Sequence, residues 1–171
     1  YPETVLGVKS AHYWTVKPWD EMHHPWTSVE RAVEAGELCG LPVMVDFWPR
    51  PPERSYPDLL LKKLRPGDIH THVFAQQFPI LAPDGRVNDF LFEARARGII
   101  FDLGHGAGSF WFRNAVPAFR GGFPPDTIST DLHMGSSVQQ RLATMDSQGI
   151  DMQALSINPF WYSAEREVAA E

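Results

Sequence analysis

Five residues that could bind a metal ion or move a proton follow strand-like apolar runs: Lys9, Asp46, His72, His105 and Asp131. Imidazole nitrogen and carboxylate oxygen are the usual ligands of zinc-class metals, and a catalytic site leaves one position for water. Such a metal lowers the pKa of the water, generates hydroxide and polarises a carbonyl group. A neighbouring carboxylate can accept the proton and pass it to the leaving group. We predict Asp131 as that base.

The most informative run is 68–74, which holds His70 and His72 two residues apart. In an extended strand, two such side chains share one face. Each residue also has a plain structural interpretation. A histidine at a strand end is often only hydrogen-bonded, an aspartate there often caps the next helix, and a buried lysine needs a partner. The coincidence of five strand ends favours a metal site.

Two loops allow competing interpretations. The glycine loop 104–108 could cradle a phosphate on backbone N–H groups, but it lacks the lysine of a P-loop and the spacing of a dinucleotide fingerprint. We favour a loop whose backbone passes close to the substrate while His105 faces it. The loop before residue 27 combines histidine with tryptophan, which predicts either aromatic packing, the favoured interpretation, or a substrate wall: His12, His23, His24, Trp14, Trp19 and Trp26.

The elements that must position these residues alternate along the chain. Apolar runs predict strands at 4–9, 43–47, 68–74, 99–103 and 127–132, with helices between them. We expect Thr27 and Glu30 to form a capping box, and Ser55, Asn88 and Ser109 to cap later helices. Pro117 should kink or shorten the last helix. Uniformly apolar strands alternating with helices predict an α/β fold with a parallel sheet covered on both faces.

Composition limits the class of protein. The 171 residues are 43% hydrophobic and carry a net charge of −6, which suits one globular unit and argues against nucleic acid. A complete (β/α)8 barrel needs about 250 residues. We expect neither a signal peptide nor membrane association, because no apolar run reaches about 20 residues. The single Cys39 is expected to be a small buried residue, and a cytoplasmic location is the default. A first residue Tyr1, close to a strand, suggests an interior fragment or a trimmed chain.

Several segments, in order and spacing, resemble the C-terminal half of a dihydroorotase-like amidohydrolase of the amidohydrolase/deacetylase subgroup. The resemblance covers about residues 5–137 and is carried by GVK (7–9), PVMVDF (42–47), RPGDIHTHVF (65–74), IIFDLGHGAGSFWF (99–112) and PDTISTDLH (125–133). It implies a partial (β/α)8 TIM barrel of the metal-dependent hydrolase type, with these strands as the fourth to the eighth.

The resemblance also implies roles for individual residues. Lys9 matches a lysine that is carboxylated and bridges two divalent metal ions, most often zinc. His72 matches the sixth-strand ligand, with His70 one layer deeper inside the barrel in a supporting role. Asp46 stands where the family usually has a histidine, which leaves the number and identity of the metals open. Asp131 matches the aspartate that binds metal and acts as base. The remaining two residues in matching motifs are given substrate-side roles: His105 and His133.

Two departures from the family follow. The first-strand HxH is absent from this chain, so we expect the isolated chain to be inactive or nearly so; a metal-dependent amidase rate comparable to a full-length relative's would refute this. The second is the tail, because residues 141–171 resemble an early βα segment of the aminocarboxymuconate-semialdehyde-decarboxylase-like branch. We therefore divide the chain into 1–137 and a divergent tail, 138–171, with a helix to Gln148 and a strand at 152–157. The tail is either a junction of related genes, a misassembled frame or a genuine divergent end.

These observations predict a metal-dependent hydrolase of C–N bonds in an amide, cyclic amide or N-acyl group, or in a related ester. One alternative is a metal-dependent decarboxylase of the tail's branch, and another is a non-catalytic barrel fragment. The expected partner is a small-molecule substrate. Exposed sheet edges and apolar strand faces would favour a homo-oligomer.

Overall fold

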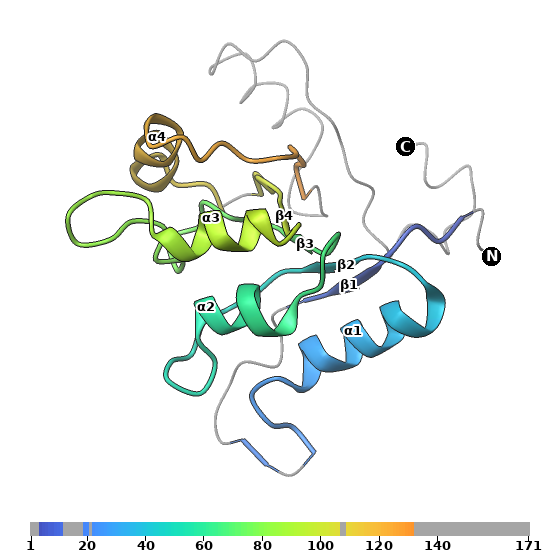
Figure 1. Cartoon of the computed structure of the whole chain (residues 1–171). Coiled ribbons are helices and arrows are strands. Elements are labelled where there is room, and N and C mark those ends of the chain that lie inside the picture. Colours follow the sequence, from blue (N-terminus) through green and yellow to red (C-terminus); the bar gives the residue numbers. More distant parts are fainter. Residues whose placement is uncertain (1–3, 12–18, 21, 107–108, 132–171) are drawn as a thin grey trace.

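The computed structural model describes residues 4–11, 19–20, 22–106 and 109–131 (Figure 1). His12, Trp14 and His133 lie outside the described residues. So does the predicted tail unit, 138–171, with its expected helix and strand. The division of the chain at residue 137 therefore stays a prediction.

A parallel sheet forms the centre of the described chain. Its strands are β1 (Val8–Ser10), β2 (Val43–Val45), β3 (Ile69–His70) and β4 (Ile100–Phe101), and they lie in sequence order. Lys9 pairs with Met44, Val45 with His70, and His70 with Phe101. Because the order never reverses, each strand is added on the same side of the one before. This winding is that of a barrel and differs from an open sheet with a switch point.

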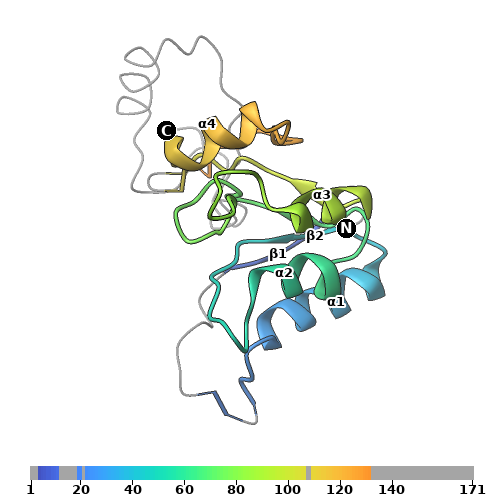
Figure 2. The same ribbon diagram turned by 60° about the vertical axis from the view of Figure 1, so that its left-hand side comes forward.

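Helices alternate with the strands. They are α1 (Thr27–Cys39), α2 (Tyr56–Asp58) continuing into the π-helix η1 (Leu59–Lys63), α3 (Asp89–Ala96) and α4 (Phe112–Arg120). Helix α1 contacts β1, β2 and η1, and η1 contacts α3, so these helices form one layer beside the sheet (Figures 1 and 2). The fully buried core between layers includes Val43, Val45, Leu59, Leu60, Leu91 and Phe101.

The strands are shorter than the apolar runs predicted. The run 68–74 is a strand only at Ile69–His70, because the chain turns into a left-handed conformation at His72, where φ is 61°. The predicted fifth strand is not a regular strand within the described residues. Thr127 makes an isolated parallel bridge with Asp102, and the backbone N–H groups of Leu103 and His105 donate to Thr127 and Ser129. This segment still runs alongside β4 and carries Asp131 to the same edge of the sheet.

Several predicted helix starts need correction. The capping box at Thr27 is wrong, because Trp26 is the N-cap and Glu30 instead bonds the side chains of His24 and Lys63. Ser109 does not cap α4, which begins at Phe112, and Pro117 lies inside that helix without ending it. Ser55 caps α2 with its side chain, as predicted. Asn88 occupies the N-cap position of α3, but its side chain makes no capping hydrogen bond.

Cys39 is exposed, contrary to the expectation that it is buried. It is the last residue of α1, and its neighbour Leu38 is 83% exposed. The apolar face of α1 instead uses Val29 and Ala32. Within the described residues, no helix combines the length and the apolar character that crossing a membrane requires.

Candidate active site

Four of the predicted residues meet at the edge of the sheet where the strands end. The Lys9 Nζ atom lies 3.3 Å from Asp131 Oδ1. The His72 Nε2 atom lies 3.5 Å from Asp131 Oδ2 and 3.9 Å from Asp46 Oδ2. Asp131 is thus the central residue of the group, and the prediction that these side chains come together is supported by the geometry.

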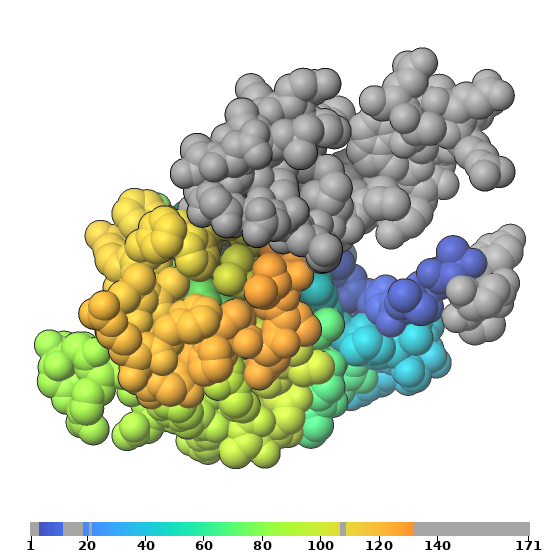
Figure 3. All heavy atoms as spheres, turned by 90° about the horizontal axis from the view of Figure 1, so that it is seen from above, coloured from blue at the N-terminus to red at the C-terminus, as the bar shows by residue number. Residues whose placement is uncertain are grey.

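The topology explains why these four residues converge. Lys9 lies in β1, Asp46 follows β2 directly, and His72 comes two residues after the end of β3. Parallel strands bring their carboxyl ends to one edge of the sheet. In the space-filling view, the orange segment that ends at residue 131 lies beside the blue and teal region of β1 and β2 (Figure 3).

His72 is held by its ring as well as by its backbone. The Gly104 carbonyl accepts a hydrogen bond from His72 Nδ1 at 2.6 Å, so Nδ1 carries a proton and Nε2 points to the carboxylates. The close approach requires glycine at position 104, where φ is 51° and a Cβ atom would lie 2.6 Å from His72 Nδ1. The glycine loop therefore approaches the metal-ligand candidate His72.

The charges of the cluster shift two pKa values in opposite directions. Burial acts to lower the pKa of His72, but the hydrogen bond with Asp131 and the charge of Asp46 raise it above the ordinary 6.5. The hydrogen bond from His72, against the opposing effect of burial, and the charge of Lys9 hold the pKa of Asp131 well below its usual range. Asp131 is therefore an ionised proton acceptor throughout the neutral range.

Lys9 differs from the expectation in one respect. The sequence suggested a buried ammonium group, but the Lys9 side chain is 38% exposed and forms an ion pair with Asp131. Its position in β1, which is the edge strand of the described sheet, accounts for this exposure.

The structure does not confirm a common environment for His70 and His72. His70 is fully buried and packs edge-on against Tyr56, Phe78 and Phe101. Tyr56 belongs to α2, so the His70 ring lies on the side of the sheet that helices cover. The reason is the left-handed backbone at His72, which breaks the strand alternation on which the prediction relied.

The substrate-side residues are only partly described. The His105 ring stacks on Phe110 with a centroid distance of 5.6 Å, and His133 lies outside the described residues. The backbone N–H groups of His105 and Gly106 donate to the carbonyls of Ser129 and Thr130. These donors are therefore occupied within the protein, which argues against the phosphate-binding interpretation of this loop.

The donor types at the cluster fit a divalent metal. Among the residues that the structure describes, no three His, Cys, Asp or Glu side chains already converge as a formed metal centre. However, His72 Nε2 faces Asp46 and Asp131, while its Nδ1 atom is fixed by a backbone carbonyl. A second hydrogen bond of this kind is what usually orients a metal-binding imidazole. Asp46, His72 and Asp131 could therefore hold the metal, with Lys9 beside them.

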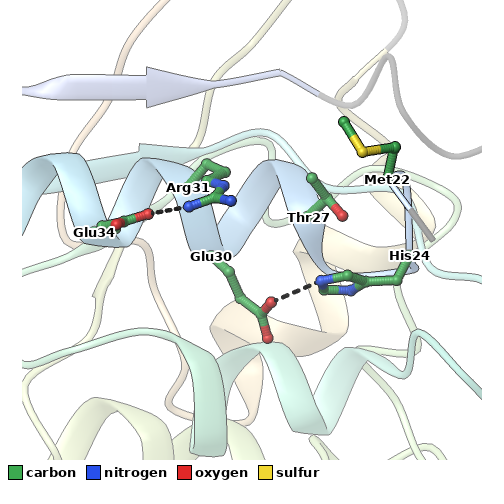
Figure 4. Close-up of a pocket in the computed structure, with 6 residues that line it drawn as sticks. All are labelled: Met22, His24, Thr27, Glu30, Arg31 and Glu34. Carbon is green, nitrogen blue, oxygen red and sulfur yellow. Dashed lines mark hydrogen bonds and ion pairs between the residues drawn. The ribbon is translucent and has the colours of Figure 1, made fainter.

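A pocket of about 420 Å³ lies elsewhere, at the start of α1 (Figure 4). The His24 Nε2 atom lies 3.3 Å from Glu30 Oε2, and Arg31 forms an ion pair with Glu34 at 2.7 Å. None of the four residues of the cluster lines this pocket. The neighbouring Trp26 stacks on Phe47, as the packing interpretation of this loop expects.

Sequence reasoning missed one buried residue beside the cluster, Asp102. It is 1% exposed and accepts hydrogen bonds from the hydroxyl groups of Thr71, Thr127 and Ser129. The position of this aspartate, directly after the apolar run 99–101, indicated that its carboxylate could be buried. A buried carboxylate requires hydrogen-bond partners.

No protein-family model matches the chain. Among curated proteins, it is 37% identical to a deacetylase from Enterococcus faecalis over 137 residues, which is 78% of this chain and 35% of that protein. It is 32% identical to a deacetylase from Agrobacterium fabrum over 108 residues, 63% of this chain and 26% of that protein. The chain thus spans only about a third of these relatives or less.

Two solved structures are similar in fold. An adenine deaminase matches with a TM-score of 0.57 and 32% identity, over 65% of this chain and 30% of that one. A dihydroorotase matches with a TM-score of 0.57 and 30% identity, over 86% of this chain and 39% of that one. The α/β class is confirmed, and these similarities agree with the predicted partial barrel and with a relation to amidohydrolases.

Proposed function

We propose that this chain is part of a metal-dependent amidohydrolase that hydrolyses a C–N bond in an amide, cyclic amide or N-acyl compound. The observation that carries the proposal is His72, whose Nε2 atom faces both Asp46 and Asp131 while Gly104 fixes its Nδ1 atom. The similarity to a deacetylase, an adenine deaminase and a dihydroorotase supports hydrolysis of C–N bonds as the class of reaction.

The proposed metal ligands are His72, Asp46, Asp131 and Lys9. When bound, a zinc-class ion would lower the pKa of water and polarise the scissile carbonyl. To hold such an ion, His72 would have to give up its Nε2 proton, because only the unprotonated nitrogen is a ligand. Lys9 would act as a carbamate, which replaces the ammonium cation with an anionic oxygen ligand. The Lys9 side chain is partly exposed, which would allow dissolved carbon dioxide to approach it.

Asp131 is the proposed base. It is ionised at neutral pH, and its Oδ2 atom lies 3.5 Å from His72 Nε2. It would take a proton from the attacking water and deliver it to the departing nitrogen, which would otherwise leave as an unstable anion. His105 and His133 are proposed to face the substrate, a small amide or ester.

Metal content tests this proposal. The purified chain would be loaded with zinc, with and without bicarbonate, dialysed and measured by elemental analysis. We expect zinc to be retained in the wild type, more with bicarbonate because it supplies the carbamate. His72→Ala and Asp131→Asn should lose it.

The control is His24→Ala, which removes an imidazole from the separate pocket at α1 and should retain zinc. Equal zinc content in the wild type, His72→Ala and Asp131→Asn would refute the assignment of the metal site.

A further inference from the structure

A single buried carboxylate connects the two segments that carry His72 and Asp131. Asp102 Oδ2 accepts hydrogen bonds from Thr71 Oγ1 at 2.6 Å and from Ser129 Oγ at 2.7 Å. Asp102 Oδ1 accepts from Thr127 Oγ1 at 2.8 Å. Thr71 immediately precedes His72, and Ser129 lies two residues before Asp131. The Asp102 side chain is therefore hydrogen-bonded to a close sequence neighbour of each of the two site residues, His72 and Asp131.

The backbone of Asp102 strengthens this connection. Its N–H group donates to the His70 carbonyl at 2.9 Å, and its carbonyl accepts from the Val73 N–H group at 3.2 Å. His72 is thus bracketed on both sides by hydrogen bonds to one residue. The neighbouring Gly104 carbonyl then fixes the ring.

The two segments need such support because each contains a strained residue. His72 has a φ of 61° and Asp131 a φ of 48°, and both are residues other than glycine. A left-handed backbone is unfavourable for such residues and persists only where the surroundings enforce it. The hydroxyl bonds to Asp102 lie one and two residues from these positions.

We infer that Asp102 is a positioning residue of the proposed hydrolase: its carboxylate holds the His72 and Asp131 segments together so that Nε2 of one faces Oδ2 of the other. This inference rests on the proposed function of the site. Among the described residues, the Asp102 carboxylate accepts hydrogen bonds from Thr71, Thr127 and Ser129, and it acts on His72 and Asp131 through these residues.

A carboxylate suits this role better than an amide. An ionised aspartate only accepts hydrogen bonds, and bonds to a charged acceptor are short and strong. Two hydroxyl groups donate to the same oxygen, Oδ2. In Asp102→Asn, either this position or Oδ1 becomes an NH₂ donor, so at least one hydroxyl must rotate away. The segments would then lose part of their connection.

The test uses three comparisons in the full chain. Asp102→Asn changes the carboxylate itself. Thr71→Val removes one donor at nearly constant volume, and Thr71→Ser restores the hydroxyl group. Asp126→Asn is the control, because Asp126 also accepts a bond from β4, at the Phe101 N–H group, but has no bond to Thr71 or Ser129.

The first readout is the ring Nδ1–H resonance of His72 in the zinc-free protein, observed by NMR and assigned by its absence in His72→Gln. We expect a slowly exchanging, downfield proton in the wild type, Thr71→Ser and Asp126→Asn. In Asp102→Asn and Thr71→Val it should shift or broaden, because the ring is no longer held against Gly104.

The second readout is zinc affinity, measured by competition with a chelator. Loss of an outer hydrogen bond typically weakens metal binding about 10–100-fold. We expect that loss in Asp102→Asn and Thr71→Val, with recovery in Thr71→Ser. Thermal unfolding is recorded for every variant, so that a general loss of stability is recognised.

The inference is overturned if Asp102→Asn and Thr71→Val keep the wild-type His72 resonance, even where their melting temperatures fall. That result would give Asp102 a purely structural role. Absence of zinc binding in the wild type would instead refute the proposed function. The two failures are distinguishable, because the resonance is measured without metal.

Discussion

At the scale of single residues, the site depends on how His72 is presented. Its ring nitrogen Nδ1 is engaged by Gly104, and its Nε2 is directed to two carboxylates. A free imidazole could satisfy the same carboxylates with either nitrogen. The Gly104 carbonyl removes this choice, and Gly104 can come so close only because it has no side chain.

Gly104→Ala should therefore displace His72. The substitution imposes a left-handed alanine, and its Cβ atom would collide with Thr71 Oγ1 and with His72 Nδ1. We expect a loss of about 2 kcal/mol or more in the free energy of unfolding, together with loss of zinc binding. Urea unfolding and zinc titration measure the two effects.

Gly85→Ala is the matched control for this prediction. Gly85 also has a positive φ, 83°, but a Cβ atom there would meet nothing within 4 Å. It should lose stability through its backbone alone and keep its zinc affinity. Equal zinc affinity in Gly104→Ala and Gly85→Ala would contradict the role given to Gly104.

The convergence of the candidate site residues was predictable from the sequence, because it depends on where the strands end. Lys9, Asp46, His72 and Asp131 converge because each lies at or near the end of a parallel strand or extended segment. Backbone conformation was not predictable, since the positive φ of His72 depends on contacts made by residues about 30 positions away in the chain. The position of His70 was wrong for the same reason.

At the scale of elements, the strands are short, and side chains at their starts help to align them. Asp68 is 1% exposed at the start of β3 and accepts the Val43 N–H group of β2 at 2.9 Å. It also binds Arg65 through the backbone N–H group at 2.8 Å and through two guanidinium bonds of 3.0 and 2.9 Å. Asp68 thus connects β2, β3 and the turn between η1 and β3.

Asp68→Ala should destabilise the protein by about 3 kcal/mol, because it leaves a partly buried guanidinium group and backbone N–H groups without their acceptor. Chemical denaturation with tryptophan fluorescence measures this change. Asp84→Ala removes a similar aspartate–arginine pair with Arg86 on the exposed surface, and should have little effect. Equal stability of the two variants would show that Asp68 does not align the strands.

Helix and strand types followed from the pattern of apolar residues, but their boundaries did not. The expected capping box at Thr27 fails because Glu30 finds stronger partners in Lys63 and His24. In that case a distant side chain competes with the local signal, and local sequence cannot reveal that competitor. The fifth strand is reduced to an isolated bridge at Thr127, although its backbone carbonyls still accept hydrogen bonds from Leu103 and His105.

At the scale of the whole molecule, an apolar layer of rings surrounds a titratable group. His70 is packed among Tyr56, Phe78 and Phe101, and its Nε2 atom has no hydrogen-bond partner among the residues that the structure describes. Burial lowers the pKa of His70 from 6.5 to about 3. The unfolded chain therefore binds a proton at His70 between these pH values, while the folded chain does not.

Stability should consequently fall as the pH is lowered from about 6.5 towards 3, by at most about 1.4 kcal/mol for each pH unit from this residue. Above pH 6.5, His70 should make no pH-dependent contribution. His70→Phe should reduce the slope in this window, as measured by urea unfolding at successive pH values.

Phe78→Leu serves as the comparison, because it alters the same cluster without removing a titratable group. It should lower stability by a similar amount at every pH. An unchanged slope in His70→Phe would contradict the burial of a neutral histidine.

Some apolar side chains on the surface of the molecule are available for association with another molecule. Exposed apolar side chains lie along α4, namely Phe112, Val116 and Phe119, and Leu6 is 79% exposed just before β1. The expectation of a homo-oligomer stays a prediction, as does the cytoplasmic location.

The sequential order of the strands bears on how the protein folds. Neighbours in the sheet are also neighbours in the sequence, so each strand can join the preceding one as soon as its own βα unit has left the ribosome. The ion pair between Lys9 and Asp131 is different, because it joins residues separated by 122 positions. Loop closure over that distance becomes favourable only once the intervening units are in place. Within the described residues, the ion pair between Lys9 and Asp131 would therefore form after the strands have paired.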